Sequence, residues 1–362
     1  MRNSILRISL TAAAAVALTA GTAAIASADE AAGPTWRISY SAPTRMSSFG
    51  DAVALSSRDV WAVGDVALST GGTRPFIRQW NGRSWTIKRL PSRYGSAQLF
   101  AVAASSARNA WVFGGYRDSA MHSHVFALQW HGSWSQRGTW PSNDQQIDSA
   151  VVLSPRDVWT FGSLGTWHFN GSRWRSFVLP FELHRASAIS ATDIWAVGVD
   201  PATRAPVVAR WHAGRWRTHP VAPIASGPPG PQFDGILARS DRDVWVVGGT
   251  VTSTGTPKPL VLHWSSGKWR QVSLAQPGNL SDVTPDGSGG LWASFLGPYG
   301  AATVAHYSAG HWRVVSLPRV PGRSTSTSAL ARVPRSKTVF LAGLSLWGHL
   351  PNTAGLILKF AG

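Results

Sequence analysis

The feature that most constrains the fold is a short sequence unit that recurs seven times along the 362-residue chain. Its clearest copy is Asp-Val-Trp-Ala-Val-Gly at residues 59–64, where a Trp anchor is followed by small or β-branched residues and a Gly. The seven aromatic anchors are Trp61, Trp111, Trp159, Trp195, Trp245, Trp292 and Phe340, at intervals of 50, 48, 36, 50, 47 and 48 residues. Repeats of this length predict an array of similar small sheets.

A second aromatic pair follows each anchor and brackets a tight turn. At residues 80–85 the pair reads Trp-Asn-Gly-Arg-Ser-Trp. Asn and Gly tolerate the positive φ angles that such hairpin turns need. Each unit is therefore predicted to contain four short strands. These are an inner strand such as residues 52–55, the strand with the anchor, a strand that ends at the first aromatic residue of the pair, and one that starts at the second.

The seventh unit is split between the two ends of the sequence. Its third strand runs to Phe360, and the Trp expected after it is found at Trp36. If the strand at residues 35–40 completes the sheet built from residues 328–362, the units close into a ring without a bare sheet edge. We therefore predict an all-β fold, a seven-bladed β-propeller of four-stranded antiparallel blades closed by its N-terminal strand. The repeated Trp residues are then packing residues between blades.

The first 28 residues have the plan of a secretory signal peptide. Arg2 and Arg7 precede an Ala-rich apolar run over residues 8–25, and Ala-Ser-Ala at 26–28 forms a small-residue cleavage site. We predict a signal peptide over residues 1–28 and a single propeller domain over 29–362. The mature protein is expected to be extracellular and monomeric, without a membrane span after cleavage. A retained membrane anchor is the alternative, although the run is weakly apolar for a stable span.

These repeats resemble those of known propellers. The period of about 48 residues, the Gly pairs at 114–115 and 248–249 and the later aromatic pair are similar to kelch-type and galactose-oxidase-like propellers. The Asp-Val-Trp-Ala-Val-Gly units more closely resemble secreted propeller proteins of actinobacteria. The resemblance implies the fold but no particular activity, and kelch propellers mostly bind proteins. The copper chemistry of galactose oxidase needs a cross-linked Cys, and this chain has no Cys.

Polar residues near the start of the inner strands are candidate site residues. Four units carry an Asp ten or eleven positions before the anchor, and the fourth unit has His and Arg there: Asp51, Asp148, Asp234, Asp282, His184 and Arg185. In a propeller these side chains would share the mouth of the central channel. Such carboxylates could hold Ca²⁺ as a cofactor, bind a polar ligand or perform acid–base chemistry. The alternative is a solvated channel in which each Asp caps a local turn.

Two further sets recur with the repeat. One Asp precedes the anchor in four units, at Asp59, Asp157, Asp193 and Asp243, and we expect these carboxylates to accept hydrogen bonds from local backbone amides. Three His share one position just before the third-strand aromatic residue, at His168, His263 and His306. Because they lie in different blades, they are too far apart to bind one metal ion.

Positive charge dominates the sequence. The chain has 34 Arg and Lys against 17 Asp and Glu, a net charge of +17. Arg follows the fourth-strand Trp in five units, at Arg37, Arg175, Arg217, Arg270 and Arg313, which predicts an exposed basic rim. The rim either keeps exposed strands soluble or attracts a polyanion. Nucleic acid is not expected, because no stacking residues alternate with these Arg. Arg74, Arg117 and Trp347 lie in the predicted ligand-face loops and are further candidates.

Two classes of function fit these observations. The leading hypothesis is a secreted, non-enzymatic binding propeller that docks a protein or an anionic cell-wall or extracellular glycopolymer. The alternative is a propeller hydrolase or lyase that acts on a saccharide or ester at the channel mouth. After residue 30, Glu182 is the only Glu, which excludes a glycosidase site built from two Glu.

Overall fold

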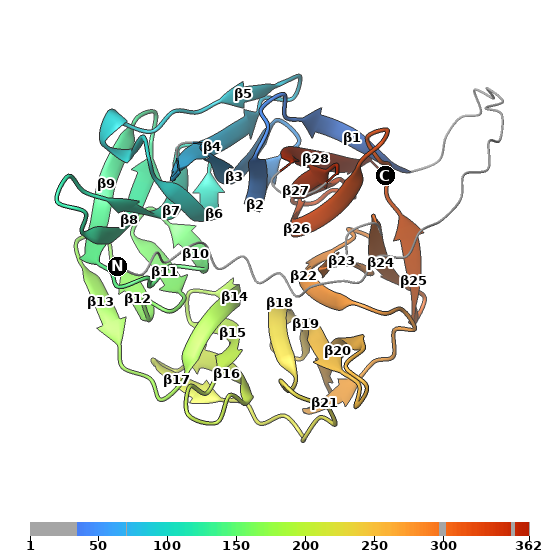
Figure 1. Ribbon diagram of the computed structural model, residues 1–362. Helices are drawn as coiled ribbons and strands as arrows, with labels where there is room; N and C mark the ends of the chain where they lie inside the picture. The colour runs from blue at the N-terminus through green and yellow to red at the C-terminus, as the bar shows by residue number, and fades with distance from the viewer. Residues whose placement is uncertain (1–34, 70, 297–301, 349–351, 362) are drawn as a thin grey trace, which may run out of the picture. The chain divides into compact units, whose positions relative to one another are not determined.

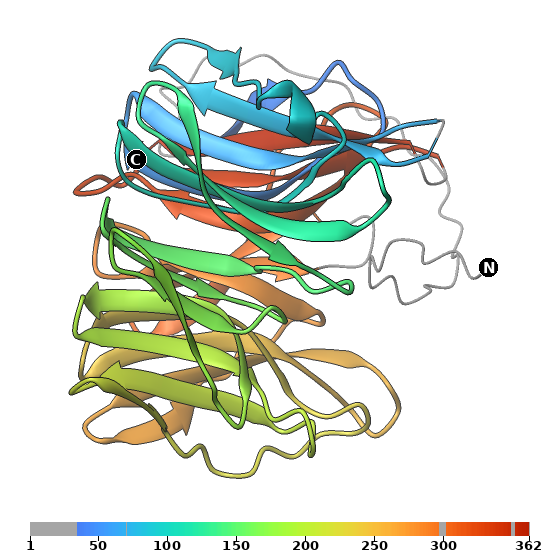
Figure 2. The same ribbon diagram turned by 90° about the vertical axis from the view of Figure 1, so that its left-hand side faces the viewer.

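Seven sheets, each of four antiparallel strands, are arranged in a ring in the computed structural model (Figure 1). The structure describes residues 35–69, 71–296, 302–348 and 352–361, so the predicted signal peptide lies outside the described residues. The seven-bladed propeller predicted from the repeats is confirmed. Seen from the side, the sheets lie face to face around the ring (Figure 2). No helix in these ranges is long and apolar enough to cross a membrane.

Each blade is numbered by its order along the chain, with its innermost strand first. Blade 1 contains β2 (Ser47–Ser56), β3 (Asp59–Ala67), β4 (Thr73–Trp80) and β5 (Trp85–Ile87). A short 3₁₀ helix, η1 (Ser92–Tyr94), precedes blade 2, which contains β6 (Gln98–Ser106), β7 (Asn109–Arg117), β8 (Ser123–Trp130) and β9 (Trp134–Pro141). Blade 3 contains β10 (Ser149–Ser154), β11 (Asp157–Phe161), β12 (Thr166–Phe169) and β13 (Trp174–Phe177).

The remaining blades follow the same plan. Blade 4 contains β14 (Glu182–Ser190), β15 (Asp193–Val199), β16 (Pro206–His212) and β17 (Arg215–Thr218). Blade 5 contains β18 (Gln232–Ser240), β19 (Asp243–Val251), β20 (Pro257–Ser265) and β21 (Lys268–Gln271). Blade 6 contains β22 (Asn279–Pro285), β23 (Leu291–Leu296), β24 (Thr303–Ser308) and β25 (His311–Ser316). Blade 7 contains β26 (Ser324–Arg332), β27 (Val339–Leu346), β28 (Thr353–Ala361) and, from the other end of the sequence, β1 (Thr35–Ser41).

The ring is closed in blade 7, where β1 pairs with β28. Trp36 lies opposite Phe360, and the antiparallel register continues to Ser41 opposite Leu356. This is the pairing that the split seventh repeat predicts. It leaves β1 as the outermost strand of blade 7, as β5 is in blade 1. Closure therefore depends on backbone hydrogen bonds between residues more than 300 positions apart.

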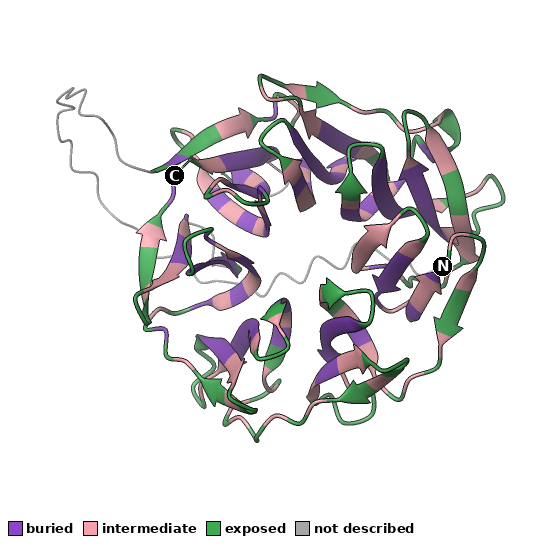
Figure 3. Ribbon diagram, turned by 180° about the vertical axis from the view of Figure 1, so that it is seen from behind, coloured by how far each residue is buried: buried purple, intermediate pink, exposed green. Residues whose placement is uncertain are grey.

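The core consists of aromatic contacts between neighbouring blades. Trp61 on the second strand of blade 1 is fully buried, and its ring lies 5.9 Å from that of Trp130 and 6.1 Å from that of Trp134 in blade 2. The same contact recurs around the ring, and Figure 3 shows the second strands largely buried. At the closure the equivalent residues are Trp292, Phe360 and Trp36. The prediction that the repeated Trp residues pack between blades is confirmed.

Candidate functional site

A β-bulge separates the four channel Asp residues into two groups. The inner strands shift register near their start, and in blades 4 and 5 the unpaired residues are His184 and Asp234. Asp51 and Asp282 follow the unpaired residue by one position and are paired to the second strand. Because successive residues of a strand point to opposite faces, Asp spaced ten and eleven positions from the anchor meet different surroundings. In the sequence, the two groups differ by one position in their distance from the aromatic anchor.

Asp51 and Asp282 connect neighbouring blades. One oxygen of Asp51 accepts the Ala52 N–H at 2.9 Å, and the other accepts the Val102 N–H of blade 2 at 2.8 Å. Asp282 repeats this with Val283 at 2.8 Å and Leu330 of blade 7 at 2.7 Å. Burial raises the pKa of each carboxyl to about 6 against the opposing effect of these hydrogen bonds. Both carboxylates thus have a structural role as bridges.

The second group joins blades 3 and 4 through hydrogen bonds. His184 Nδ1 lies 2.9 Å from Asp148 Oδ2, and Gln146 donates to the other Asp148 oxygen at 2.5 Å. Arg185 donates to the backbone carbonyl of Asp148. Burial raises the pKa of Asp234 to about 6, although the charges of Arg185 and His184 oppose the rise. The structure therefore joins Asp148, His184 and Arg185 of blades 3 and 4 by hydrogen bonds, and Asp234 of blade 5 lies within the influence of the His184 and Arg185 charges.

The central channel holds a polar cavity of about 280 Å³, which Asp51, Asp282 and the exposed Arg185 line together. Arg185 is the cation whose charge acts on Asp51, Asp234 and Asp282. Over the described ranges, no three His, Asp or Glu side chains lie together in a way that could hold a metal ion. The four Asp residues therefore do not converge into the multi-carboxylate site considered for Ca²⁺.

The Asp residues at the turn into the second strand have side-chain partners, and here the prediction of local backbone partners is wrong. Asp157 lies 2.8 Å from His168 on the third strand, and Asp243 lies 3.0 Å from His263. In the other two blades the partners are Gln79 for Asp59 and Arg210 for Asp193. Each His also stacks on the anchor of its blade, with ring centroids 4.2 Å apart for Trp159 and 3.9 Å for Trp245.

This arrangement also explains the position of His306. Its Nε2 lies 2.9 Å from Asp286, and its ring stacks on Trp292 at 4.1 Å. Burial works to raise the pKa of Asp286, but hydrogen bonds from His306, Ser288 and Gly290 outweigh it and hold that pKa below its usual value. The shared position of the three His was visible in the sequence. Their Asp partners were not, because the pairing joins different strands.

The exposed face made by the blade-to-blade connections and the second-to-third-strand loops carries a basic surface over blades 7, 1 and 2. Its aromatic centre is Trp347, which is half-buried in the loop after β27. The Arg323 guanidinium lies 4.0 Å from the Trp347 ring centroid and that of Arg45 lies 5.9 Å away. Such distances are typical of cation–π contacts. Arg323 also donates to Ser345 at 3.3 Å, which fixes its position.

Contacts between loops extend this surface across blades 1 and 2. Met46, next to Arg45, accepts the Ala67 N–H at 2.8 Å, and Thr73, next to Arg74, donates to Ser96 at 3.4 Å. The Arg93 guanidinium lies 5.0 Å from the ring of Tyr94, whose ring in turn lies 5.3 Å from that of Tyr116 beside Arg117. We call this set the basic arc: Arg45, Arg74, Arg93, Arg117, Arg323 and Trp347.

The structure thus places three predicted candidates, Arg74, Arg117 and Trp347, in one arc, and adds Arg45 and Arg323. Arg323 was missed because it reaches Trp347 through the pairing of β26 with β27, and Arg45 because its connection becomes a neighbour of Trp347 only through ring closure. Within the described part of the chain, the only Arg or Lys residues that form ion pairs with carboxylates are Arg210 and Arg239. Most acidic groups are instead held by His, Gln or backbone partners, so the Arg charge remains available on the surface.

The predicted rim is also present. Arg37, Arg175, Arg217, Arg270 and Arg313 are exposed on the outermost strands, while the Trp beside each is buried or half-buried. The alternation expected for these strands is confirmed. The rim surrounds the ring, whereas the basic arc occupies one sector of one face.

Comparison with known proteins supports the fold. The structure is similar to that of YCF48 bound to D1 peptide, at 13% identity and a TM-score of 0.59, over 94% of this chain and 98% of that one. It is also similar to the WD40 β-propeller domain of Doa1, at 12% identity and a TM-score of 0.55, over 89% and 96%. No family model and no curated protein sequence matches this chain. At these identities the likeness shows a β-propeller fold alone, and the kelch or galactose-oxidase type stays a prediction.

Proposed function

We propose that this protein is a secreted, monomeric binding propeller that docks an anionic glycopolymer on the basic arc. The observation that carries the proposal is the arc itself. Guanidinium groups from three blades lie on this face, and the Trp347 ring already packs against that of Arg323 at 4.0 Å. An extended row of cations matches a polymer with repeated negative charges. The aromatic ring between them offers an apolar surface to the sugar rings. Secretion rests on the predicted signal peptide.

A binding role fits the channel better than catalysis does. Both oxygens of Asp51 and of Asp282 already accept backbone N–H groups of two blades. Asp148 is likewise held by Gln146 and His184. A hydrolase or lyase at the channel mouth would need carboxylates free to exchange protons with a substrate. Of the four predicted Asp residues, Asp234 is the one without such partners among the described residues.

The proposal predicts salt-dependent binding that maps to the arc. Polygalacturonate is the anionic probe and dextran the neutral one, with affinity measured by calorimetry between about 50 and about 300 mM NaCl. We expect polygalacturonate to bind and dextran not to bind. The affinity for polygalacturonate should fall steeply as salt screens the charges. The double variant R323A/W347A should bind at least about tenfold more weakly, a loss of about 1.4 kcal/mol or more.

The matched control is the rim variant R175A/R217A, which removes two exposed Arg outside the arc. It should bind within a factor of about two of the wild type. Affinity that does not change with salt, or a rim variant as defective as the arc variant, would contradict the proposal. YCF48 carries a bound peptide in its structure, so an acidic protein is the competing partner. Salt-sensitive binding to polyglutamate without binding to polygalacturonate would favour that partner and overturn the glycopolymer.

A further inference from the structure

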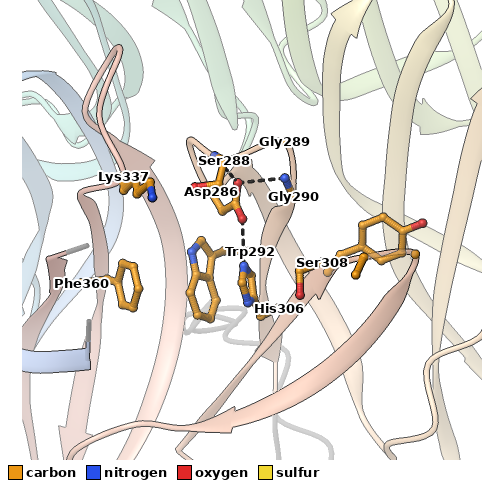
Figure 4. A pocket seen from close by; sticks show the side chains of 12 residues that line it. Asp286, Ser288, Gly289, Gly290, Trp292, His306, Ser308, Lys337 and Phe360 are labelled. Carbon is orange, nitrogen blue, oxygen red and sulfur yellow. Dashed lines mark hydrogen bonds and ion pairs between the residues drawn. The ribbon is translucent and has the colours of Figure 1, made fainter. Parts of the chain in front are cut away.

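A second cavity lies on the opposite face of the ring, between blades 6 and 7. Its volume is about 520 Å³, within the range of small-molecule sites. It is lined by the turn after β22, the end of β24, the turn before β27 and the end of β28. Figure 4 shows Phe360, Trp292 and His306 side by side, with Lys337 above Phe360 and Asp286 above Trp292 and His306. The basic arc is on the other face, so the two surfaces are independent.

The cavity occurs where the ring is closed, and the repeat shows what is different there. In the other blades a tight turn joins the third and fourth strands, as residues 170–173 do between Phe169 and Trp174. In blade 7 these strands are β28 and β1, which no such turn connects. The third-strand residue is also smaller. Four blades have Trp at this position, at Trp80, Trp130, Trp211 and Trp264, and blade 7 has Phe360.

The larger residue has a defined partner in blade 1. Trp80 donates its indole N–H to the carbonyl of Ser57, in the turn between the first and second strands, at 3.0 Å. The equivalent turn of blade 7 contains Ser336 and Lys337. Phe360 is only half-buried and cannot make this bond. Blade 3 also has Phe at this position, Phe169, but there the turn is present; in blade 7 the open space lies where the Trp and the turn are both lacking.

The charged groups of the cavity determine which ligand it fits. Asp286 is only 6% exposed, and its oxygens are taken by the backbone N–H groups of Ser288 and Gly290 and by His306. Lys337 is exposed and, among the described residues, forms no ion pair or hydrogen bond. The ammonium group is therefore the charge that remains for a ligand. Trp292 and Phe360 provide an apolar wall on the same side of the cavity.

We propose that this cavity binds a carboxylate carried on a six-membered ring, with the carboxylate at Lys337 and the ring against Phe360 and Trp292. An acidic sugar and an aromatic acid share this chemistry. The hydroxyl groups of Ser288 and Ser308 are within the lining and suit the hydroxyls of a sugar.

The test uses D-glucuronate and benzoate as probes and D-glucose as the neutral control, with binding followed by ligand-observed NMR and calorimetry. We expect at least one of the two carboxylates to bind saturably below about 10 mM, and glucose to bind at least tenfold more weakly. Binding of glucuronate would assign the site to acidic sugars, and binding of benzoate alone would assign it to aromatic acids. Failure of both to saturate, or equal binding of glucose, overturns the proposal.

Two variants locate the binding. Lys337→Ala removes the cation and should weaken carboxylate binding at least tenfold. Phe360→Trp restores the residue that four other blades carry, fills the cavity and should abolish binding while the melting temperature is kept. The matched controls are Lys268→Ala, an exposed Lys on the same face in blade 5, and Phe169→Trp, the same change in blade 3.

Both controls should bind like the wild type. If Lys337→Ala and Phe360→Trp also bind like the wild type, the ligand is elsewhere and the proposal is wrong. Since Lys337 is exposed, its variant remains informative even if Phe360→Trp destabilises the fold. Loss of polygalacturonate binding in R323A/W347A with unchanged carboxylate binding would show that the two sites are separate.

Discussion

At the scale of single residues, the position of an Asp within the repeat decides its chemistry. Asp51 and Asp282 bridge backbone amides of two blades, and Asp157 and Asp243 pair with His on a neighbouring strand of the same blade. Of these four carboxylates only that of Asp243 also pairs with an Arg, at Arg239, and the other partners are backbone amides or His. Most acidic side chains are therefore hydrogen-bonded within the fold, and, over the described ranges, the excess of Arg remains on the surface without carboxylate partners.

The bridging carboxylates predict a pH dependence of stability. Burial raises the pKa of Asp51 and Asp282 from 3.8 to about 6 in the folded protein. Between these values the folded state binds more protons than the unfolded state, so the free energy of unfolding falls as pH rises from about 4 to about 6. Each carboxyl contributes at most about 3 kcal/mol to this fall. The variant D51N/D282N should show a flatter dependence in urea unfolding across that window.

Other groups titrate in the same pH range, but they are present in both the wild type and D51N/D282N. Asp65 and Asp234 also have pKa values raised to about 6, and burial lowers the pKa of His219, which acts in the opposite direction. The control is D118N. Hydrogen bonds from His124 and His122 lower the pKa of Asp118 to about 2, so this variant should alter only the dependence below about pH 4. An unchanged slope between pH 4 and 6 in D51N/D282N would contradict the assignment.

At the scale of elements, β1 is the strand on which closure depends. It is joined to blade 7 through the register of Trp36 with Phe360 and through aromatic contacts. The Trp36 ring lies 5.3 Å from that of Trp292 in blade 6 and 5.6 Å from that of Phe360. One residue thus packs β1 both on its own sheet and on the neighbouring blade 6.

Trp36→Ala should therefore lower the free energy of unfolding by about 3–5 kcal/mol, the usual cost of truncating a buried Trp. The measurement is urea unfolding followed by circular dichroism. The control on the same strand is Ile38→Ala, because Ile38 is 39% exposed and should contribute within about 0.5 kcal/mol. Equal losses for the two variants would show that Trp36 is not part of a packed core.

At the scale of the whole molecule, the ring makes the blades nearly equivalent. Each blade packs on its two neighbours through the same aromatic contact, and blade 7 does so although its strands come from both ends of the chain. Stability should then depend on closing the ring and not on where the chain is cut.

A circular permutant tests this. Phe360 is joined to Trp36 through Asn-Gly-Ser-Arg, the turn that follows Phe169 in blade 3, and the chain is opened between Gly132 and Ser133 in the equivalent turn of blade 2. We expect the same circular dichroism spectrum and a single cooperative thermal transition. The added turn lies at the cavity between blades 6 and 7. A permutant that does not fold, or that melts in two steps, would show that the natural closure point is special.

The number of blades, the four strands of each and the closing strand could all be predicted from the sequence. This is possible because each blade is a local unit: Trp61 and the turn between Trp80 and Trp85 repeat a pattern that can be read within about 50 residues. The burial of the Trp anchors follows from the same pattern. The candidate channel residues were identified by position, but their two different environments were not.

The tertiary structure decided which residues meet. The bulge separates His184 and Asp234 from Asp51 and Asp282, although one position in spacing is all that distinguishes them in the sequence. Ring closure brings Arg45 beside the Trp347 loop and opens the cavity at Phe360. The physical reason is that the strand pattern depends on residues close together in the sequence. Contacts between blades depend instead on the register with which distant strands pair.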